Sequence, residues 1–60
     1  MNLTTKELAA IEDMLNGEAN TVKKFSMYAQ NAPDTQTRAK YEQLAAKHQE
    51  HFNKLLSFLN

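Results

Sequence analysis

Near the middle of the chain stands the segment Asn31-Ala32-Pro33-Asp34, which decides how the two halves of the sequence are arranged. Asn, Pro and Asp are common in turns, and Pro33 has no backbone N–H with which to continue a helix. Asp34 belongs to the residue types that cap the first N–H groups of a following helix. The segment therefore predicts a turn over residues 31–34 between two separate helices.

The residues before the turn carry one helical stripe. Its members recur at alternating steps of three and four, the spacing of a buried helix face: Leu8, Ile11, Leu15, Glu18, Val22, Phe25, Ala29 and Ala32. Glu18 is the one member that is not apolar. Thr4 and Glu7 form the T-x-x-E pattern of a capping box, which marks a helix start. We therefore expect a first helix over about residues 4–30.

The dipeptide Asn16-Gly17 is typical of turns, and a break there would give three short helices instead of two. Leu15, Glu18 and Val22 keep the stripe in phase across it, which favours one continuous helix. A glycine inside a helix costs about 1 kcal/mol relative to alanine, which a helix of this length tolerates. Gly17 is then either a local defect or room for close helix approach beside Glu18.

The residues after the turn repeat the pattern. Positions 35–59 contain neither glycine nor proline, which predicts a second helix over about residues 35–59. Its stripe consists of Tyr41, Leu44, His48, His51, Leu55 and Phe58. The two members that are not apolar are the only histidines of the chain, and their spacing of three puts both on one helix face.

An antiparallel hairpin with its turn near Pro33 sets residues at equal height when their numbers sum to about 66. This rule pairs Ile11 with Leu55, Leu15 with His51, Glu18 with His48, Val22 with Leu44, and Phe25 with Tyr41. A carboxylate and two imidazoles would thus meet in neighbouring layers of the core. Such groups are costly to bury unless they are paired or bind a metal.

Two interpretations of this polar layer remain open. In the structural one, Glu18 and His48 form an ion pair that fixes the register of the hairpin without any metal. In the other, Glu18, His48 and His51 are ligands of a divalent transition metal such as iron, manganese or zinc, with open coordination positions.

The size of the chain favours self-association. A domain of 60 residues buries only about 60% of its unfolded surface, and the absence of cysteine excludes disulfides. Further apolar side chains widen the helix faces beyond what one partner helix would cover: Met14, Ala19, Tyr28, Ala45, Phe52, Leu56 and Leu59. We therefore predict an all-α fold, an antiparallel two-helix hairpin that dimerises into a four-helix bundle.

Composition also argues against several classes of function. Seven basic and seven acidic residues give a formal net charge of zero, so there is no electrostatic case for nucleic acid or an anionic membrane as partner. No apolar stretch would span a bilayer and no secretory signal is evident, which predicts a soluble, intracellular protein. Arrangements for nucleophilic catalysis or phosphate binding are absent from the sequence, so we do not expect an enzyme.

Three segments carry a resemblance to a known family: residues 3–8 (LTTKEL), 23–29 (KKFSMYA) and 45–56 (AAKHQEHFNKLL). They resemble the small coat F-type spore coat proteins of endospore-forming bacteria, and A-x-[KR]-H-Q-x-H-[FY]-N-x-L-L is the specific part. The resemblance covers nearly the whole chain. It implies a ferritin-like helical hairpin, half of a four-helix bundle, made in the cytoplasm of a sporulating cell and associated with the spore coat and its other proteins.

Ferritin-like proteins with two metal ions supply a glutamate from one helix and an E-x-x-H motif from the next. Glu18 resembles the first glutamate and His51 the motif histidine, but His48 stands where the motif has its glutamate. This departure argues against a di-iron oxidase. We therefore expect a non-enzymatic structural protein of the spore coat, and as the alternative a ferritin-like metal-binding or redox protein that uses Glu18, His48 and His51.

Overall fold

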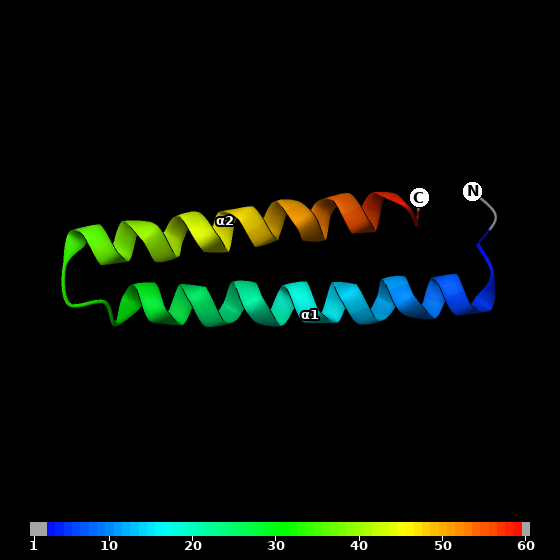
Figure 1. Ribbon diagram of the computed structural model, residues 1–60, viewed down its shortest axis with the longest axis horizontal. Helices are drawn as coiled ribbons and strands as arrows, with labels where there is room; N and C mark the ends of the chain where they lie inside the picture. Colours follow the sequence, from blue (N-terminus) through cyan, green and yellow to red (C-terminus); the bar gives the residue numbers. More distant parts are fainter. Residues whose placement is uncertain (1–2, 60) are drawn as a thin grey trace.

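The structure is a computed structural model that describes residues 3–59, and it consists of two antiparallel α-helices joined by a short turn (Figure 1). Helix α1 spans Thr5–Gln30 and helix α2 spans Thr35–Ser57. The described part of the chain contains no strand. The predicted all-α hairpin is therefore confirmed, with its turn at residues 31–34.

Both helices begin at the caps that the sequence predicts. The Thr4 hydroxyl accepts the N–H of Glu7 at 3.0 Å, and the Glu7 carboxylate accepts the N–H of Thr4 at 2.9 Å, which completes a capping box. At the start of α2, the Asp34 carboxylate accepts the N–H of Thr37 at 2.7 Å. These backbone hydrogen bonds to the ionised carboxylates lower the pKa of Glu7 and of Asp34.

Helix α2 ends at Ser57, earlier than the predicted end near residue 59. The N–H of Phe58 bonds to the carbonyl of Leu55 at 3.1 Å, and that of Leu59 bonds to Leu56 at 3.0 Å. These bonds reach back three residues instead of four, so the last turn tightens and leaves the α-helical geometry.

Helix α1 runs without a break through Asn16 and Gly17, which confirms the continuous helix. Gly17 does not have a positive φ angle, so its backbone conformation is open to any L-residue. Beyond its chain neighbours and the backbone of its own helix, a Cβ atom built on Gly17 would meet no atom within 4 Å. Within the hairpin, Gly17 therefore does not serve a close approach of α1 and α2.

The face of α1 that meets α2 is the predicted stripe. Its half-buried members are Ile11, Leu15, Glu18, Val22 and Phe25, and Ala29 is buried. Leu8 departs from the prediction, because 39% of it is exposed. The register places Leu8 level with about residue 58, which lies beyond the end of α2.

The face of α2 that meets α1 differs from the prediction. Apart from Thr37 in its first turn, the more buried residues of α2 are Tyr41, Ala45, His48, Phe52 and Leu55. The predicted members Leu44, His51 and Phe58 are exposed and lie along one edge of this face. The apolar stripe of α2 is wider than the surface that contacts α1. The spacing of three and four residues therefore does not predict which edge of the stripe faces α1.

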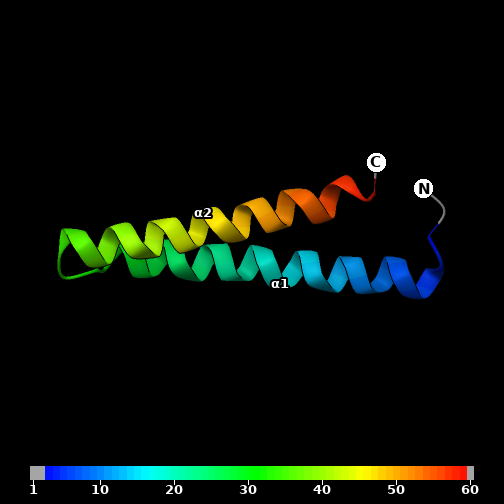
Figure 2. The ribbon, with the colours of Figure 1, turned by 45° about the horizontal axis from the view of Figure 1, so that its top comes forward.

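The hairpin is a single layer with almost no interior. Its Cα atoms extend over 46 × 14 × 10 Å, and Figure 2 shows α1 and α2 lying side by side with nothing covering either flank. Among residues 3–59 only Ala29 (5% exposed) and Ala45 (9%) are buried. Neither α1 nor α2 has a run of apolar residues long enough to cross a membrane.

Candidate functional site

A polar cluster lies across the seam between the two helices. Nδ1 of His48 lies 3.1 Å from Oε1 and 3.3 Å from Oε2 of Glu18, and Nδ1 of His51 lies 3.1 Å from Oε2. One carboxylate on α1 thus bridges two imidazoles on α2. The predicted pairing of Glu18 with His48 is confirmed, and the structure brings all three predicted site residues together.

The helix geometry explains why a single carboxylate reaches both rings. His48 and His51 are three residues apart, so they project from neighbouring turns on one side of α2. Their rings meet edge to face with centroids 5.3 Å apart. Because the two rings are adjacent, Glu18 accepts from His48 on the seam and from His51 beside it without changing its place on α1.

Phe25 supports the cluster in a way that the sequence analysis missed. Its ring stacks on His48 with centroids 5.7 Å apart and an interplanar angle of 25°. It also stacks on Tyr41 at 6.1 Å, which is the pairing that the register predicts. Tyr41 and His48 are two helical turns apart on the same face of α2. This spacing was the available signal that Phe25 reaches both rings.

The exposed fraction of the three side chains increases from the seam to the surface. The exposed fraction of the side chain is 20% for Glu18, 27% for His48 and 50% for His51. An ionised carboxylate only accepts hydrogen bonds, so each contact requires a proton on the Nδ1 atom that faces it. Both Nε2 atoms are left for other partners. At this exposure, water competes for the polar atoms and weakens their interactions.

The cluster opens into a groove of about 540 Å³ along one flank of the hairpin. Its lining consists of Met14, Gly17, Glu18, Thr21, His51, Lys54, Leu55 and Phe58. The Thr21 hydroxyl donates to the carbonyl of Gly17 at 2.9 Å. Because Glu18 and His51 line this groove, a solute has access to their polar atoms from this flank.

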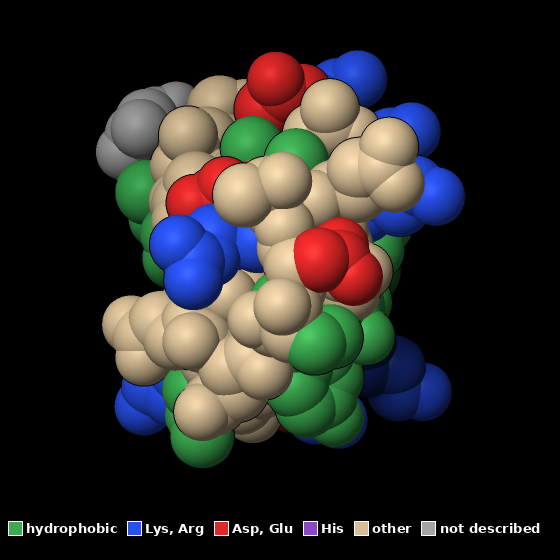
Figure 3. Space-filling view, turned by 90° about the vertical axis from the view of Figure 1, so that its left-hand side faces the viewer, with side chains coloured by type: hydrophobic (Ala, Val, Ile, Leu, Met, Phe, Trp, Pro, Cys, Tyr) green, Lys and Arg blue, Asp and Glu red, His purple; other side chains and the backbone are tan. Residues whose placement is uncertain are grey.

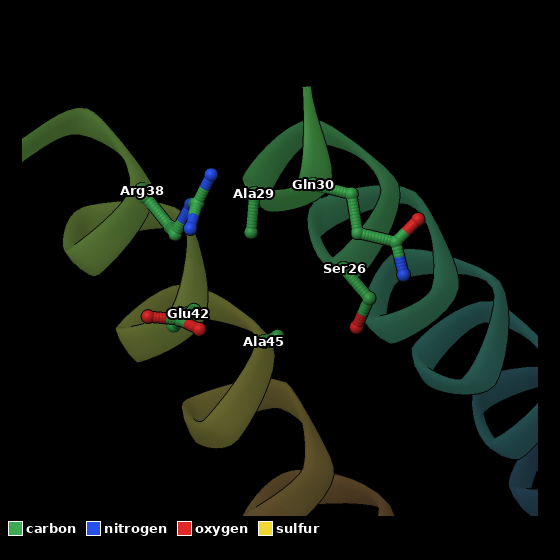
Figure 4. A pocket seen from close by; sticks show the side chains of 6 residues that line it. All are labelled: Ser26, Ala29, Gln30, Arg38, Glu42 and Ala45. Atoms are coloured by element: carbon green, nitrogen blue, oxygen red, sulfur yellow. The ribbon is translucent and has the colours of Figure 1, made fainter. Parts of the chain in front are cut away.

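A second hollow of about 510 Å³ lies nearer the turn. In Figure 4, Ser26 and Gln30 of α1 stand on one side and Arg38 and Glu42 of α2 on the other. Ala29 and Ala45, the two buried residues, belong to its lining, so their small side chains explain why the surface is hollowed here. This hollow contains no member of the polar cluster.

Glu18, His48 and His51 are the one group of three or more metal-ligand side chains found among residues 3–59. Their ligand atoms all lie within 4.8 Å of one another. The arrangement is compatible with both interpretations of the sequence, because a bridging carboxylate fixes helix register and is also a metal-ligand type.

Comparisons of the chain with known protein families, with curated proteins and with solved structures find no match. The resemblance of residues 45–56 to coat F-type spore coat proteins stays a prediction.

Proposed function

We propose that this chain is a non-enzymatic structural protein whose hairpin pairs with a second copy to form a four-helix bundle. The observation that carries the proposal is the near absence of a core: in residues 3–59 only Ala29 and Ala45 are buried. Two buried alanines and a seam of half-buried side chains supply too little apolar burial to offset the entropy of ordering two long helices. A second layer of helices would supply the missing burial.

The exposed apolar side chains mark the flank that the second copy would cover. Leu44 and His51 of α2 and Phe58 directly after it recur every seven residues along one edge. His51 and Phe58 line the groove that holds the polar cluster, and Leu44 lies nearer the turn. On α1, Met14 lines the same groove and Tyr28 follows on the same side two heptads later. We call these five residues the groove face. Met14, Tyr28, Leu44 and Phe58 are 39–48% exposed.

The position of the α2 stripe supports this flank over the other. In a four-helix bundle each helix contacts two neighbours, so its apolar stripe is centred between the two interfaces instead of on one seam. Tyr41, His48 and Leu55 lie on the seam, and the remaining members of the predicted stripe lie on the groove face. The predicted stripe of α2 therefore does not match the seam of a single hairpin, but it matches the face of a helix that contacts two neighbours in a bundle of two hairpins.

The charges favour a second copy of this chain as the partner that covers the groove face. The formal net charge is zero, so two copies meet without overall repulsion. Seen from the turn end, apolar side chains reach the surface between acidic and basic ones, without one sign of charge covering this end (Figure 3). A two-fold axis would also make the groove face self-complementary.

The polar cluster would help to fix the register of the helices in this bundle. Glu18 lies close to the midpoint of α1 (Thr5–Gln30), so a two-fold axis across the hairpins would bring both clusters to about the same level. The groove face of the partner would then cover His51. A polar group in a helical interface stabilises the register in which it is paired and disfavours others.

The proposed location is the spore coat of a sporulating cell, with other coat proteins as partners. Its support is the resemblance of three segments, above all AAKHQEHFNKLL at residues 45–56. Detection of the chain in coat extracts of purified spores would support the location. Its presence in growing cells and absence from spores would contradict it.

Two matched variants test the bundle. Leu44→Lys places a charge on the groove face, and Leu56→Lys places the same charge on the opposite flank of α2 at similar exposure (39% and 42%). Sedimentation equilibrium should give a dimer for the wild type and for Leu56→Lys, and a monomer with reduced helicity for Leu44→Lys. A dimeric Leu44→Lys would refute the groove face as the interface, and a monomeric wild type would refute the bundle.

A further inference from the structure

We propose that Glu18, His48 and His51 form a binding site for one divalent transition-metal ion per chain, of the zinc class. The ligand atoms would be Oε2 of Glu18 and the Nδ1 atoms of both histidines. Oε2 lies 3.1 Å from Nδ1 of His51 and 3.3 Å from Nδ1 of His48. One carboxylate oxygen thus already faces two imidazole nitrogens.

These separations are close to those around a bound ion. Ligand atoms about 2.0–2.2 Å from a tetrahedral metal stand roughly 3.3–3.6 Å from one another. The two contacts of Oε2 therefore need to lengthen by only a few tenths of an ångström. The third separation, between a ligand nitrogen of His48 and one of His51, is within 4.8 Å. Rotation of His51, whose side chain is 50% exposed, can shorten it without disturbing the seam.

The donor set selects the class of ion. Imidazole suits zinc, iron, cobalt, nickel and copper, whereas magnesium and calcium prefer coordination by oxygen alone. With two nitrogens and one oxygen, the cluster favours a transition metal over either of those two ions. An ion bound here would take the place of the Nδ1 protons that now face the carboxylate, and each neutral imidazole would then carry its proton on Nε2.

The surroundings provide both support and access. The Phe25 ring stacks on His48 and restricts its rotation, so this ligand is held in place before an ion arrives. On the other side, Glu18 and His51 line the groove, where the absence of a side chain on Gly17 leaves open space. In the single hairpin, where the groove is open, water would complete the coordination, as in metal sites with three protein ligands.

This inference goes beyond the structural role and does not depend on it. All three ligands come from one chain, so a hairpin that proved stable without a partner would still bind the ion. A dimer that stays metal-free would leave the proposed bundle intact. Failure of either proposal would therefore leave the other intact.

Metal titration of untagged protein, stripped with chelator and dialysed, tests the site. Zn²⁺ binding is measured by calorimetry, Co²⁺ binding by visible absorption, and Mg²⁺ serves as the oxygen-preferring comparison. We expect one Zn²⁺ or Co²⁺ per chain and no stoichiometric Mg²⁺. Glu18→Gln and His51→Gln should each weaken Zn²⁺ binding by more than the roughly 10- to 100-fold that loss of an outer-shell partner causes. Glu12→Gln, an exposed carboxylate on α1, is the control and should bind as the wild type.

A wild type without stoichiometric Zn²⁺ binding would overturn the proposal, and so would equal affinity in Glu18→Gln, His51→Gln and Glu12→Gln. Circular dichroism checks that each variant is helical. Proton resonances of the histidine rings give a second measurement that needs no variant. On addition of Zn²⁺, the signals of both His48 and His51 should shift and saturate at one equivalent. Unchanged signals would refute the site.

Discussion

Glu18 of α1 and His48 of α2 lie 30 residues apart in the chain, and their side chains meet at 3.1 Å across the seam. A slip of α2 by one turn moves His48 by about 5.4 Å along the helix and removes this contact. The pair therefore favours one register in a hairpin whose other seam contacts are apolar and less directional.

Loss of the Glu18 carboxylate is expected to destabilise the hairpin. Glu18→Ala leaves two Nδ1–H groups without their acceptor, and we expect a loss of about 1–3 kcal/mol in the free energy of unfolding, measured with urea. Glu18→Gln retains one acceptor oxygen and should lose less. The exposed Glu12→Gln is the control and should stay within about 0.5 kcal/mol of the wild type. Equal stability of Glu18→Ala and the wild type would contradict a structural role for the cluster.

Phe25 is expected to be the apolar residue that most affects stability. Its ring contacts Tyr28, Tyr41 and His48 with centroids 5.7–6.1 Å apart. Phe25→Ala removes all three contacts and should cost about 2 kcal/mol, less than a fully buried phenylalanine because this one is half-buried. Met27→Ala, at a position that is 56% exposed, is the comparison and should change little. A similar loss in both variants would show that the aromatic stack is not a stabilising centre.

Gly17→Ala is expected to stabilise α1. The helix is continuous there, and the added Cβ has no atom within 4 Å beyond its chain neighbours and its own helix backbone. Alanine is also the better helix former by about 1 kcal/mol. The reverse change at an exposed neighbour, Ala19→Gly, should lower stability by a similar amount. Thermal unfolding followed by circular dichroism measures both. A lower melting temperature for Gly17→Ala would show that a partner packs against Gly17.

Acid is expected to weaken both helix starts. The pKa values of Glu7 and Asp34 are lowered in the folded chain by hydrogen bonds from backbone N–H groups. Their stabilisation is therefore present above the ordinary values, 4.5 and 3.8, and is lost as the pH falls through the lowered folded values. The double variant Glu7→Gln with Asp34→Asn retains capping side chains that do not ionise. In urea unfolding between pH 7 and pH 2, it should lose less stability than the wild type. An equal loss would contradict the capping account.

The sequence predicts the hairpin because its decisive signals are local. Pro33 and Asp34 set the turn and the second cap, and Thr4 with Glu7 sets the first. With the turn known, the equal rise of two helices predicts that Glu18 meets His48 and Phe25 meets Tyr41. These are consequences of chain geometry and need no knowledge of packing.

The rotation of α2 about its axis was not predictable in this way. Ala45 and Phe52 turn toward α1 where Leu44 and Phe58 were expected, because a wide apolar stripe has two edges and periodicity does not choose between them. Periodicity also did not predict that Glu18 contacts His51 as well as His48. The equal-height rule paired His51 with Leu15, and only the side-chain directions show that the carboxylate bridges both rings.

Thermal unfolding at increasing chain concentration tests the central claim most directly, namely that this hairpin needs a second copy of itself. If folding and dimerisation are coupled, the melting temperature rises with protein concentration by mass action. We predict such a rise for the wild type across a 100-fold concentration range, and its absence in Leu44→Lys. A cooperative transition at one temperature for all concentrations would show that the hairpin is stable alone, and would contradict the proposed bundle.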